Sequence, residues 1–211
     1  MTSLGQIGAF RTLRRLHYDA EVEYLESTGT QWIDTGVPLG EMDVRARVNF
    51  MYWSMPGGGT KMILASGVGS NRGFVISTAL SNGAQVWNLG IGANNFGGSV
   101  VGNTWYDVQA SIRSTGSTLT VDGTTVVSSS AYSNFNDVSL FIFARNNTGT
   151  ADLLDVSAPA RVASLDISVS GTLVRDFIPV RVGNVGYMYD RVSGQLFGNA
   201  GTGAFLYGND I

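Results

Sequence analysis

Glycine divides this chain into segments that are too short for helices. Between residues 173 and 205 the sequence reads LVRDFIPVRVGNVGYMYDRVSGQLFGNAGTGAF, in which apolar and aromatic residues are separated by closely spaced glycines. This spacing predicts short strands joined by tight turns. Residues 22–37, near the other end of the chain, show the same pattern of short apolar segments separated by glycine. Because a sheet protein must pair or cover its edge strands, we predict that these two stretches pair and close one unit over residues 22–207.

Composition supports an all-β chain with a single core. Glycine contributes 28 of the 211 residues, about twice its typical share of about 7%. Charged residues make up 14%, against about 25% in typical globular proteins. Windows rich in Glu, Lys and Ala are nearly absent beyond the first twenty residues, which argues against an α/β fold. The length suits one sandwich domain, and no repeat period indicates a propeller or a solenoid. Because the chain has no cysteine, disulfides and thiolate metal sites are excluded.

Alternating residues and turn motifs locate several elements. Residues 43–50 and 105–113 alternate between apolar and polar side chains, which predicts half-buried antiparallel strands. The dipeptide Asp122-Gly123 favours a type I′ hairpin turn, because both central positions of that turn need a positive φ. Small and amide residues predict loops at 90–103 and 146–155.

Three segments together resemble a known class of domain. They read VEYLESTGTQWIDTGV, ARVASLDISVSGTLVRDFIPVR and YDRVSGQLFGNAGTGAF. They are similar to the jelly-roll domain of the concanavalin A-like, laminin G-like (LamG-like) class, which recurs in virion proteins of phages and prophages of gut bacteria and in some bacterial surface proteins. The resemblance covers residues 21–211 and implies an all-β, antiparallel jelly-roll β-sandwich. This fold hosts lectins, glycosidases, adhesion modules and structural decorations, so the resemblance implies no single function.

Residues 1–20 differ from the rest and are predicted to form a short N-terminal arm. Apolar residues recur there at helical spacing, with three arginines among them. One interpretation is a loose leader or a cap over a strand end. The other is an anchoring arm that docks on another protein, with its arginines meeting carboxylates of the partner. The predicted partner-binding residues of this arm are Phe10, Arg11, Leu13, Arg14 and Arg15.

Charge and hydropathy narrow the classes of partner. A net charge of −3 gives no broad basic field, so we expect no nucleic-acid binding. The apolar runs are of strand length, so we expect no membrane association. The chain start has too short an apolar run for a signal peptide. Together with the resemblance, this favours a protein made in the bacterial cytoplasm and displayed outside the cell on a virion. The sequence leaves open whether it forms a homo-oligomer.

The acidic segment EVEYLE, at residues 21–26, is the candidate for catalysis. Its residues Glu21, Glu23 and Glu26 resemble the E-x-D-x-x-E strand of some concanavalin-like glycosidases, in which two carboxylates do the chemistry. The alternative is a set of solvated acids on an edge strand that resist edge-to-edge pairing. His17 is the single histidine, which removes Ser-His-Asp machinery and multi-histidine metal sites. We expect a protein without enzymatic activity.

Sugar binding is expected where aromatic and amide residues gather. Trp87 and Trp105 lie on predicted strands and are expected in the core, whereas Trp53 is expected to be exposed beside a glycine-rich loop. The candidate glycan-binding residues are Tyr52, Trp53, Asn94, Asn95, Arg145 and Asn146.

No cofactor is expected, with bound calcium as the alternative. Carboxylate and amide oxygens on loops are the ligands that calcium prefers. Two loops supply such groups, one with Asn134, Asn136 and Asp137, the other with Asn146, Asn147 and Asp152. Asn and Asp also populate turns for local reasons, so no metal ligand is assigned.

The leading hypothesis is a non-enzymatic structural protein of a phage virion. It would be a capsid decoration or a tail or fibre component that displays a lectin-like jelly roll, is held to other virion proteins by its arm, and touches host or mucosal glycans. The alternative is a carbohydrate-binding or adhesin module of a bacterial surface. A glycoside hydrolase is the third hypothesis, and it predicts that Glu23→Gln abolishes hydrolysis.

Overall fold

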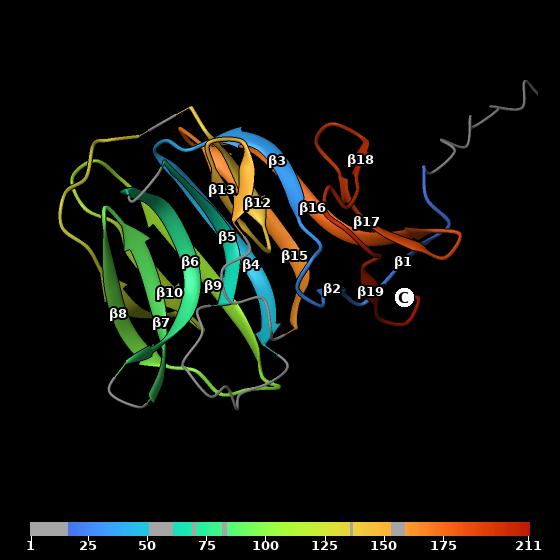
Figure 1. Ribbon diagram of the computed structural model, residues 1–211, viewed down its shortest axis with the longest axis horizontal. Helices are drawn as coiled ribbons and strands as arrows, with labels where there is room; N and C mark the ends of the chain where they lie inside the picture. The colour runs from blue at the N-terminus through green and yellow to red at the C-terminus, as the bar shows by residue number, and fades with distance from the viewer. Residues whose placement is uncertain (1–16, 51–60, 69–70, 82–83, 136, 153–158) are drawn as a thin grey trace, which may run out of the picture.

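A computed structural model describes residues 17–50, 61–68, 71–81, 84–135, 137–152 and 159–211 (Figure 1). The described residues form strands, turns and irregular segments, with no α-helix among them. Accordingly, this part of the chain offers no helix with the length and hydropathy to cross a bilayer. Two sheets pack face to face as a β-sandwich, as the sequence predicts.

The first sheet is antiparallel and holds both ends of the domain. Its main strands, in spatial order, are β11 (Thr124–Ser128), β10 (Thr118–Val121), β9 (Trp105–Ile112), β4 (Met42–Phe50), β15 (Ala160–Val169), β16 (Thr172–Val182), β17 (Val185–Asp190) and β18 (Gln195–Phe197). Three short strands join it at the side: β1 (Ala20–Glu21) pairs with β16, β2 (Leu25–Ser27) pairs with β15, and β19 (Leu206–Tyr207) pairs with β2.

The second sheet covers one face of the first (Figure 1). Its order is β14 (Thr150–Asp152), β13 (Arg145–Asn147), β5 (Lys61–Val68), β6 (Asn71–Ser81), β7 (Ala84–Ile91) and β8 (Ala93–Ser99), and β12 (Ser139–Ile142) pairs with both β3 (Ile33–Pro38) and β5. Its described pairs are antiparallel except for β13 and β5, which run parallel.

The core lies between the sheets and follows from the period of two along each strand. On β4, Val44, Ala46 and Val48 are buried, whereas Arg45 and Arg47 are exposed. Successive side chains of a strand point to opposite faces, so the apolar set enters the core and the arginines lie on the open face.

The two ends of the domain pair, as the sequence predicts. Leu25 of β2 lies opposite Tyr207 of β19, and an isolated bridge joins Val22 to Asp210. The backbone nitrogen of Ile211 donates to the carbonyl oxygen of Glu21 over 3.1 Å. This pairing covers the edge of β2 that β15 leaves open.

Residues 18–20, which were predicted to be the end of the arm, pack on the sandwich. Tyr18 packs edge to face on Tyr189 with ring centroids 4.9 Å apart, and Asp19 accepts a hydrogen bond from the backbone nitrogen of Gly183. Ala20 pairs with Arg181 of β16. The last residues assigned to the arm therefore belong to the sandwich. The predicted partner-binding residues at positions 10 to 15 lie outside the described residues.

Two stretches expected to be loops contain strands. Residues 90–103 include β8, and residues 146–155 include β14 and the last two residues of β13, joined by Thr148 and Gly149 with φ of 51° and 88°. The predicted type I′ turn has positive φ at both Asp122 and Gly123, 47° and 80°. Small residues are required in β8 by close packing, since a Cβ on Gly97 would lie 1.9 Å from the carbonyl oxygen of Val126 in β11.

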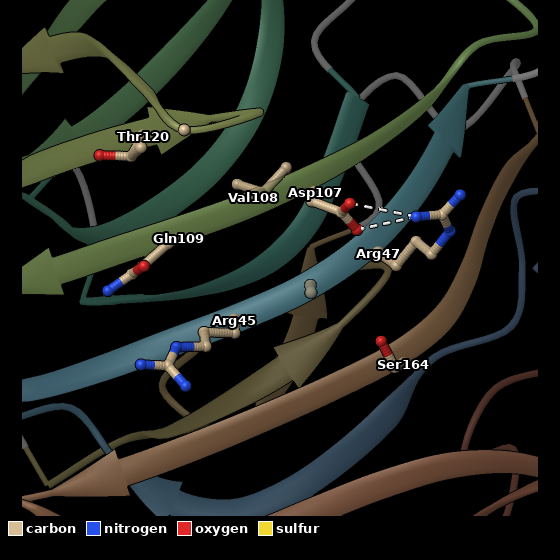
Figure 2. Close-up of a pocket in the computed structure, with 9 residues that line it drawn as sticks. Arg45, Arg47, Asp107, Val108, Gln109, Thr120 and Ser164 are labelled. Atoms are coloured by element: carbon tan, nitrogen blue, oxygen red, sulfur yellow. Dashed lines mark hydrogen bonds and ion pairs between the residues drawn. The ribbon is translucent and has the colours of Figure 1, made fainter.

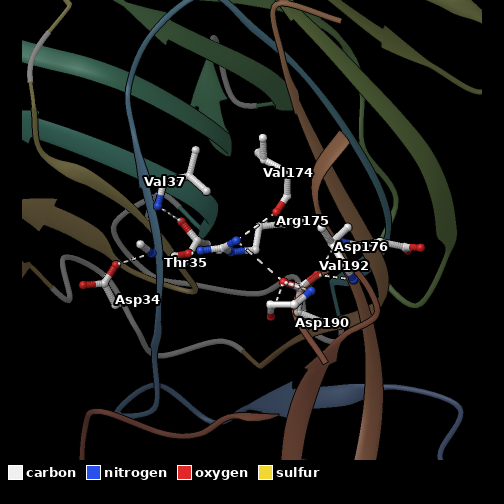
Figure 3. Close-up of polar contacts among 10 residues, drawn as sticks. Asp34, Thr35, Val37, Val174, Arg175, Asp176, Asp190 and Val192 are labelled. Carbon is white, nitrogen blue, oxygen red and sulfur yellow. Dashed lines mark hydrogen bonds and ion pairs between the residues drawn. The ribbon is translucent and has the colours of Figure 1, made fainter. Parts of the chain in front are cut away.

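A buried carboxylate holds β16, β17 and β3 together. Asp190 is fully buried and accepts hydrogen bonds from the backbone nitrogens of Asp176, at 2.8 Å, and Val192, at 3.1 Å. Figure 3 shows Arg175 between Thr35 and Asp190: its Nε donates to the Thr35 carbonyl over 2.9 Å, and its Nη1 lies 3.6 Å from the carboxylate. Charge and hydrogen bonds together compensate the cost of burying this group.

Candidate functional site

The open face of the first sheet carries a hollow of about 310 Å³. This volume is at the lower end of the range of small-molecule pockets, about 300 to 1,000 Å³. Side chains and backbone from β4, β9, β10, β15 and the β10–β11 turn line it (Figure 2). The lining residues are Arg45, Ala46, Arg47, Asp107, Val108, Gln109, Thr120, Gly123 and Ser164.

Strand register brings the polar side chains of the hollow together. Arg45 lies opposite Gln109 across β4 and β9, and Gln109 lies opposite Thr120 across β9 and β10. Arg47 is flanked by Asp107 on one side and Ser164 on the other. Directly opposite residues of antiparallel strands share a face, so two polar rows cross the sheet side by side.

An open ion pair forms one wall of the hollow. Nη1 of Arg47 lies 3.1 Å from both carboxylate oxygens of Asp107, and Figure 2 shows the two side chains facing each other across adjacent strands. Their side chains are 50% and 66% exposed, so the pair adds about 1 kcal/mol or less to the stability. The backbone nitrogen of Asp107 is bonded to Asp122 of the type I′ turn, which fixes the strand end. The pair is therefore positioned but accessible.

Aromatic rings continue this face beyond the ion pair. Trp105 precedes Asp107 by two residues on β9, and the guanidinium of Arg47 lies 5.9 Å from its ring centroid. The ring of Tyr24 is 6.0 Å from that of Trp105, and Arg161 covers Tyr24 at 4.1 Å. Both aromatic residues are partly exposed. Aromatic surface therefore lies directly beside hydrogen-bonding groups.

A buried amide lies in the next row of this face. Asn49 lies opposite both Trp105 and Arg161, is only 4% exposed, and finds no hydrogen-bond partner for its Oδ1 among the described residues. A buried carbonyl oxygen without a partner costs free energy. Such a cost is tolerated more often at functional sites than elsewhere.

Asp166, a carboxylate with a raised pKa, lies next to Arg45 of the hollow. Asp166 of β15 lies opposite Arg45 on one side and Asp176 on the other. Burial raises the pKa of Asp166, the charge of Arg45 lowers it and the charge of Asp176 raises it, and the result lies above the usual value.

A second hollow, of about 240 Å³, is lined by Glu41, Asp43, Arg113, Ser170 and Gly171. Its charged groups bond to one another or to the adjacent turn. Arg113 bonds both oxygens of Asp43, and Ser114 donates its backbone nitrogen and hydroxyl to Glu41, which lowers the pKa of Glu41. These internal bonds leave this hollow less suited to a ligand than the first.

The acidic segment proposed for catalysis does not assemble into a pair. Oε1 of Glu21 accepts the Tyr18 hydroxyl, and Oε2 of Glu26 accepts Nε of Arg161 over 2.6 Å. Glu23 bonds the backbone and side-chain nitrogens of Asn209. Each acid thus has its own structural partner. Among the residues that line the first hollow, Asp107 is the single carboxylate.

The residues proposed for sugar contact that the structure describes lie on two separate strands, β8 and β13. Tyr52 and Trp53 lie outside the described residues. Asn94 and Asn95 lie on β8, where Nδ2 of Asn95 bonds the Leu89 and Ala93 carbonyl oxygens.

Arg145 and Asn146 lie in the β13–β14 hairpin and are buried. The Arg145 guanidinium pairs with Asp152, and the Asn146 amide bonds Ser139 and the backbone of Gly149. The bonds of Asn146 Oδ1 and of the Asp152 carboxylate therefore lie within this hairpin, and both groups were proposed as calcium ligands.

The two tryptophans on predicted strands differ in burial. Trp87 is fully buried against Phe50 and Tyr106, in the core as predicted. Trp105, predicted to lie in the core, is instead partly exposed on the open face, because it shares the outward side of β9 with Asp107. Within the described ranges, no group of three or more His, Asp or Glu side chains is arranged to hold a metal ion.

The sequence predictions do not include the hollow, although the alternating polar residues that line it can be recognised in the sequence. Arg45 and Arg47 alternate on one strand, and Asp107 and Gln109 alternate on another. Each pair predicts an outward face. Only the register shows that the two faces adjoin.

Comparisons with known proteins support the fold class. No protein-family model matches the chain, and no curated protein matches it. A candidate carbohydrate binding protein from Bacteroides ovatus ATCC 8483 superposes with a TM-score of 0.62 at 11% identity, over 90% of this chain and 61% of that one. The chain therefore spans about three fifths of the length of that protein. At this identity the likeness shows the fold, a β-sandwich.

More distant matches have TM-scores below 0.5. The carbohydrate binding module CBM66 from Bacillus subtilis gives 0.43 at 9% identity, covering 72% of this chain and 91% of that one. The enzymatically active domain of bacteriophage CBA120 tailspike protein 2 gives 0.42 at 13% identity, covering 65% of this chain and 23% of that one.

Proposed function

We propose that this protein is a carbohydrate-binding module that holds a glycan in the hollow on its first sheet. The observation that carries the proposal is the lining: donors and acceptors from four strands share one open face beside the Trp105 ring. Sugar hydroxyls both donate and accept, so guanidinium, carboxylate, amide and hydroxyl groups suit them. The fold likeness to the Bacteroides ovatus protein supports the same class.

The lining is suited to binding because it is already ordered. Arg47 and Asp107 hold each other in place yet stay exposed, so less side-chain entropy is lost when a ligand arrives. Their remaining donors and lone pairs are free to bond sugar hydroxyls. Trp105 offers a flat apolar surface to the C–H face of a sugar ring.

We propose binding without hydrolysis. Glycosidases of the common kind place two carboxyl groups on either side of the scissile bond. The lining of the hollow supplies one, Asp107, and its charge is paired with Arg47.

A glycan array with the full chain tests the proposal. Trp105→Ala and Asp107→Ala should each weaken binding to the best ligand at least tenfold while the melting temperature changes little. Phe96→Ala is the matched control, since Phe96 is an exposed aromatic on the second sheet. Loss of binding in Phe96→Ala with retention in Trp105→Ala would place the site elsewhere, and an array without any ligand would overturn the proposal.

A second proposal concerns where the module is displayed. The three arginines and spaced apolar residues of positions 1–16 suit an arm that docks on an acidic surface, and the sequence resemblance points to a phage virion. Because Tyr18 to Ala20 pack on the sandwich, the deletion that tests an arm should stop at residue 16. Particle incorporation should be lost while glycan binding and the melting temperature are kept.

A further inference from the structure

Arg45 differs from the other arginines whose side chains the structure describes. Seven of them lie within 4 Å of a carboxylate: Arg47 with Asp107, Arg113 with Asp43, Arg145 with Asp152, Arg161 with Glu26, Arg175 with Asp190, Arg181 with Asp210, and Arg191 with Asp176. With the carboxylates of the described residues Arg45 makes no such pair, although it is exposed and lines the hollow.

The carboxylates of Asp166 and Asp43 lie near enough for their charges to act on Arg45, but neither is within ion-pair distance of its guanidinium. Asp166 lies directly opposite Arg45 on β15, yet no ion pair forms between them. Figure 2 shows the guanidinium of Arg45 extended from β4 on the same side as Gln109. The cation is thus presented to the hollow and keeps its bonding capacity.

The neighbours of Arg45 add neutral hydrogen-bonding groups in a line. Gln109 and Thr120 follow it across β9 and β10. With strands about 4.8 Å apart, this row is about 10 Å long. A guanidinium offers planar, paired donors that match an oxyanion, whereas amide and hydroxyl groups match neutral hydroxyls.

We propose that the hollow selects acidic sugars, with Arg45 binding the carboxylate of a uronic acid and Gln109 and Thr120 binding hydroxyls of the same glycan. The proposal rests on the proposed function and names its ligand class. A sulfate ester presents the same oxyanion chemistry. Carboxylated sugars are the ligand to which we commit, because a planar carboxylate matches the guanidinium fork.

Binding to defined polysaccharides tests this selectivity. The probes are polygalacturonate, alginate and hyaluronan, with fully methyl-esterified polygalacturonate and neutral galactan as uncharged counterparts and dextran sulfate as the sulfated arm. Wild type should bind at least one carboxylated polymer at least tenfold more tightly than the uncharged ones, and more tightly than dextran sulfate. Esterification keeps the sugar backbone and removes the charge, so it isolates the role of the carboxylate.

Two variants that each remove one positive charge, and one that keeps it, assign the effect to Arg45. Arg45→Gln should weaken binding of the carboxylated polymer at least tenfold, and Arg45→Lys should restore part of it. Arg181→Gln is the control, since it removes the same charge at a distant pair with Asp210 and should leave binding unchanged. Equal losses in both Gln variants would show a general charge effect and overturn the inference, as would tightest binding to dextran sulfate.

The failure of this inference is distinguishable from failure of the proposed function. If wild type binds esterified or neutral polymers as tightly as acidic ones, and Trp105→Ala abolishes that binding, the hollow is a sugar site without acidic selectivity. If wild type binds none of the polymers and no glycan on the array, both proposals are wrong.

Discussion

Arg161 donates a hydrogen bond from its Nε to Oε2 of Glu26 over 2.6 Å, and the two side chains are 22% and 9% exposed. The bond joins β15 to β2 near the start of the domain. Glu26→Gln should therefore lower the free energy of unfolding by about 1.5 to 3 kcal/mol, as for a hydrogen bond to a charged group. Chemical denaturation measures the change.

Glu23→Gln is the control for this variant. Glu23 is exposed, so its substitution should change the free energy of unfolding by less than about 1 kcal/mol. If Glu26→Gln instead unfolds like wild type and removes a hydrolytic activity, the acidic segment is catalytic and the structural role assigned to it here is wrong.

The buried carboxylate of Asp190 should be among the most sensitive positions of the sandwich. Asp190→Ala would leave Arg175 without its partner and the backbone nitrogens of Asp176 and Val192 without an acceptor. Breaking a buried pair in this way costs about 3 to 5 kcal/mol, measured by urea denaturation. Asp107→Ala removes an exposed pair and should cost about 1 kcal/mol or less. Similar losses in the two variants would contradict the role given to Asp190.

Gly97 should not tolerate a side chain. A methyl group there would meet the Val126 carbonyl oxygen at 1.9 Å, so β8 and β11 would have to move apart. Gly97→Ala should lower the free energy of unfolding by about 1 to 3 kcal/mol or more. Gly40→Ala is the matched control, because nothing lies within 4 Å of its added Cβ and its φ is not positive. Equal thermal stability of the two variants would show that the sheets separate easily at this edge.

The raised pKa of Asp166 predicts a pH-dependent stability. A carboxyl group whose pKa is higher in the folded state destabilises that state once it is charged, so its cost is absent below the unfolded pKa and complete above the folded pKa. Asp166→Asn should therefore melt at a higher temperature than wild type at pH 7, and the difference should shrink at pH 3.

The stability contributed by Asp210 should depend on pH in the opposite direction. The hydrogen bond from Arg181 lowers the pKa of Asp210, so its contribution is present near neutral pH and is lost as pH falls. Asp210→Asn should melt below wild type at pH 7 and approach it at pH 3. Two variants with shifts of the same sign at pH 7 would contradict this account of the charges.

Local sequence patterns predicted much of the sandwich. The alternation around Val44 and Arg45 gave the buried and open faces of β4, and Asp122-Gly123 gave the hairpin turn. The pairing of the two chain ends followed from the requirement to cover an edge. These features depend on residues that are close in sequence or on a general rule for sheets.

Features that depend on distant contacts were missed. The glycines of β8 suggested a loop. Position 97 is a glycine because the backbone of β11 lies against it and leaves no room for a side chain. The hollow was missed for a similar reason, since Arg45, Gln109 and Thr120 come from three strands and meet only through register. Aromatic and amide residues adjacent in sequence were a poor guide, because Asn146 uses its amide to hold a hairpin.

The bridge between Val22 and Asp210 has a use in protein engineering. Ile211 lies beside Glu21 of β1, so a short linker could join them. The result would be a circular permutant with new termini at the exposed turn of Thr148 and Gly149. Such a permutant would move both attachment points onto the second sheet, away from Arg45 and Trp105, so that a biosensor or an affinity matrix could carry the module with its open face toward the solution.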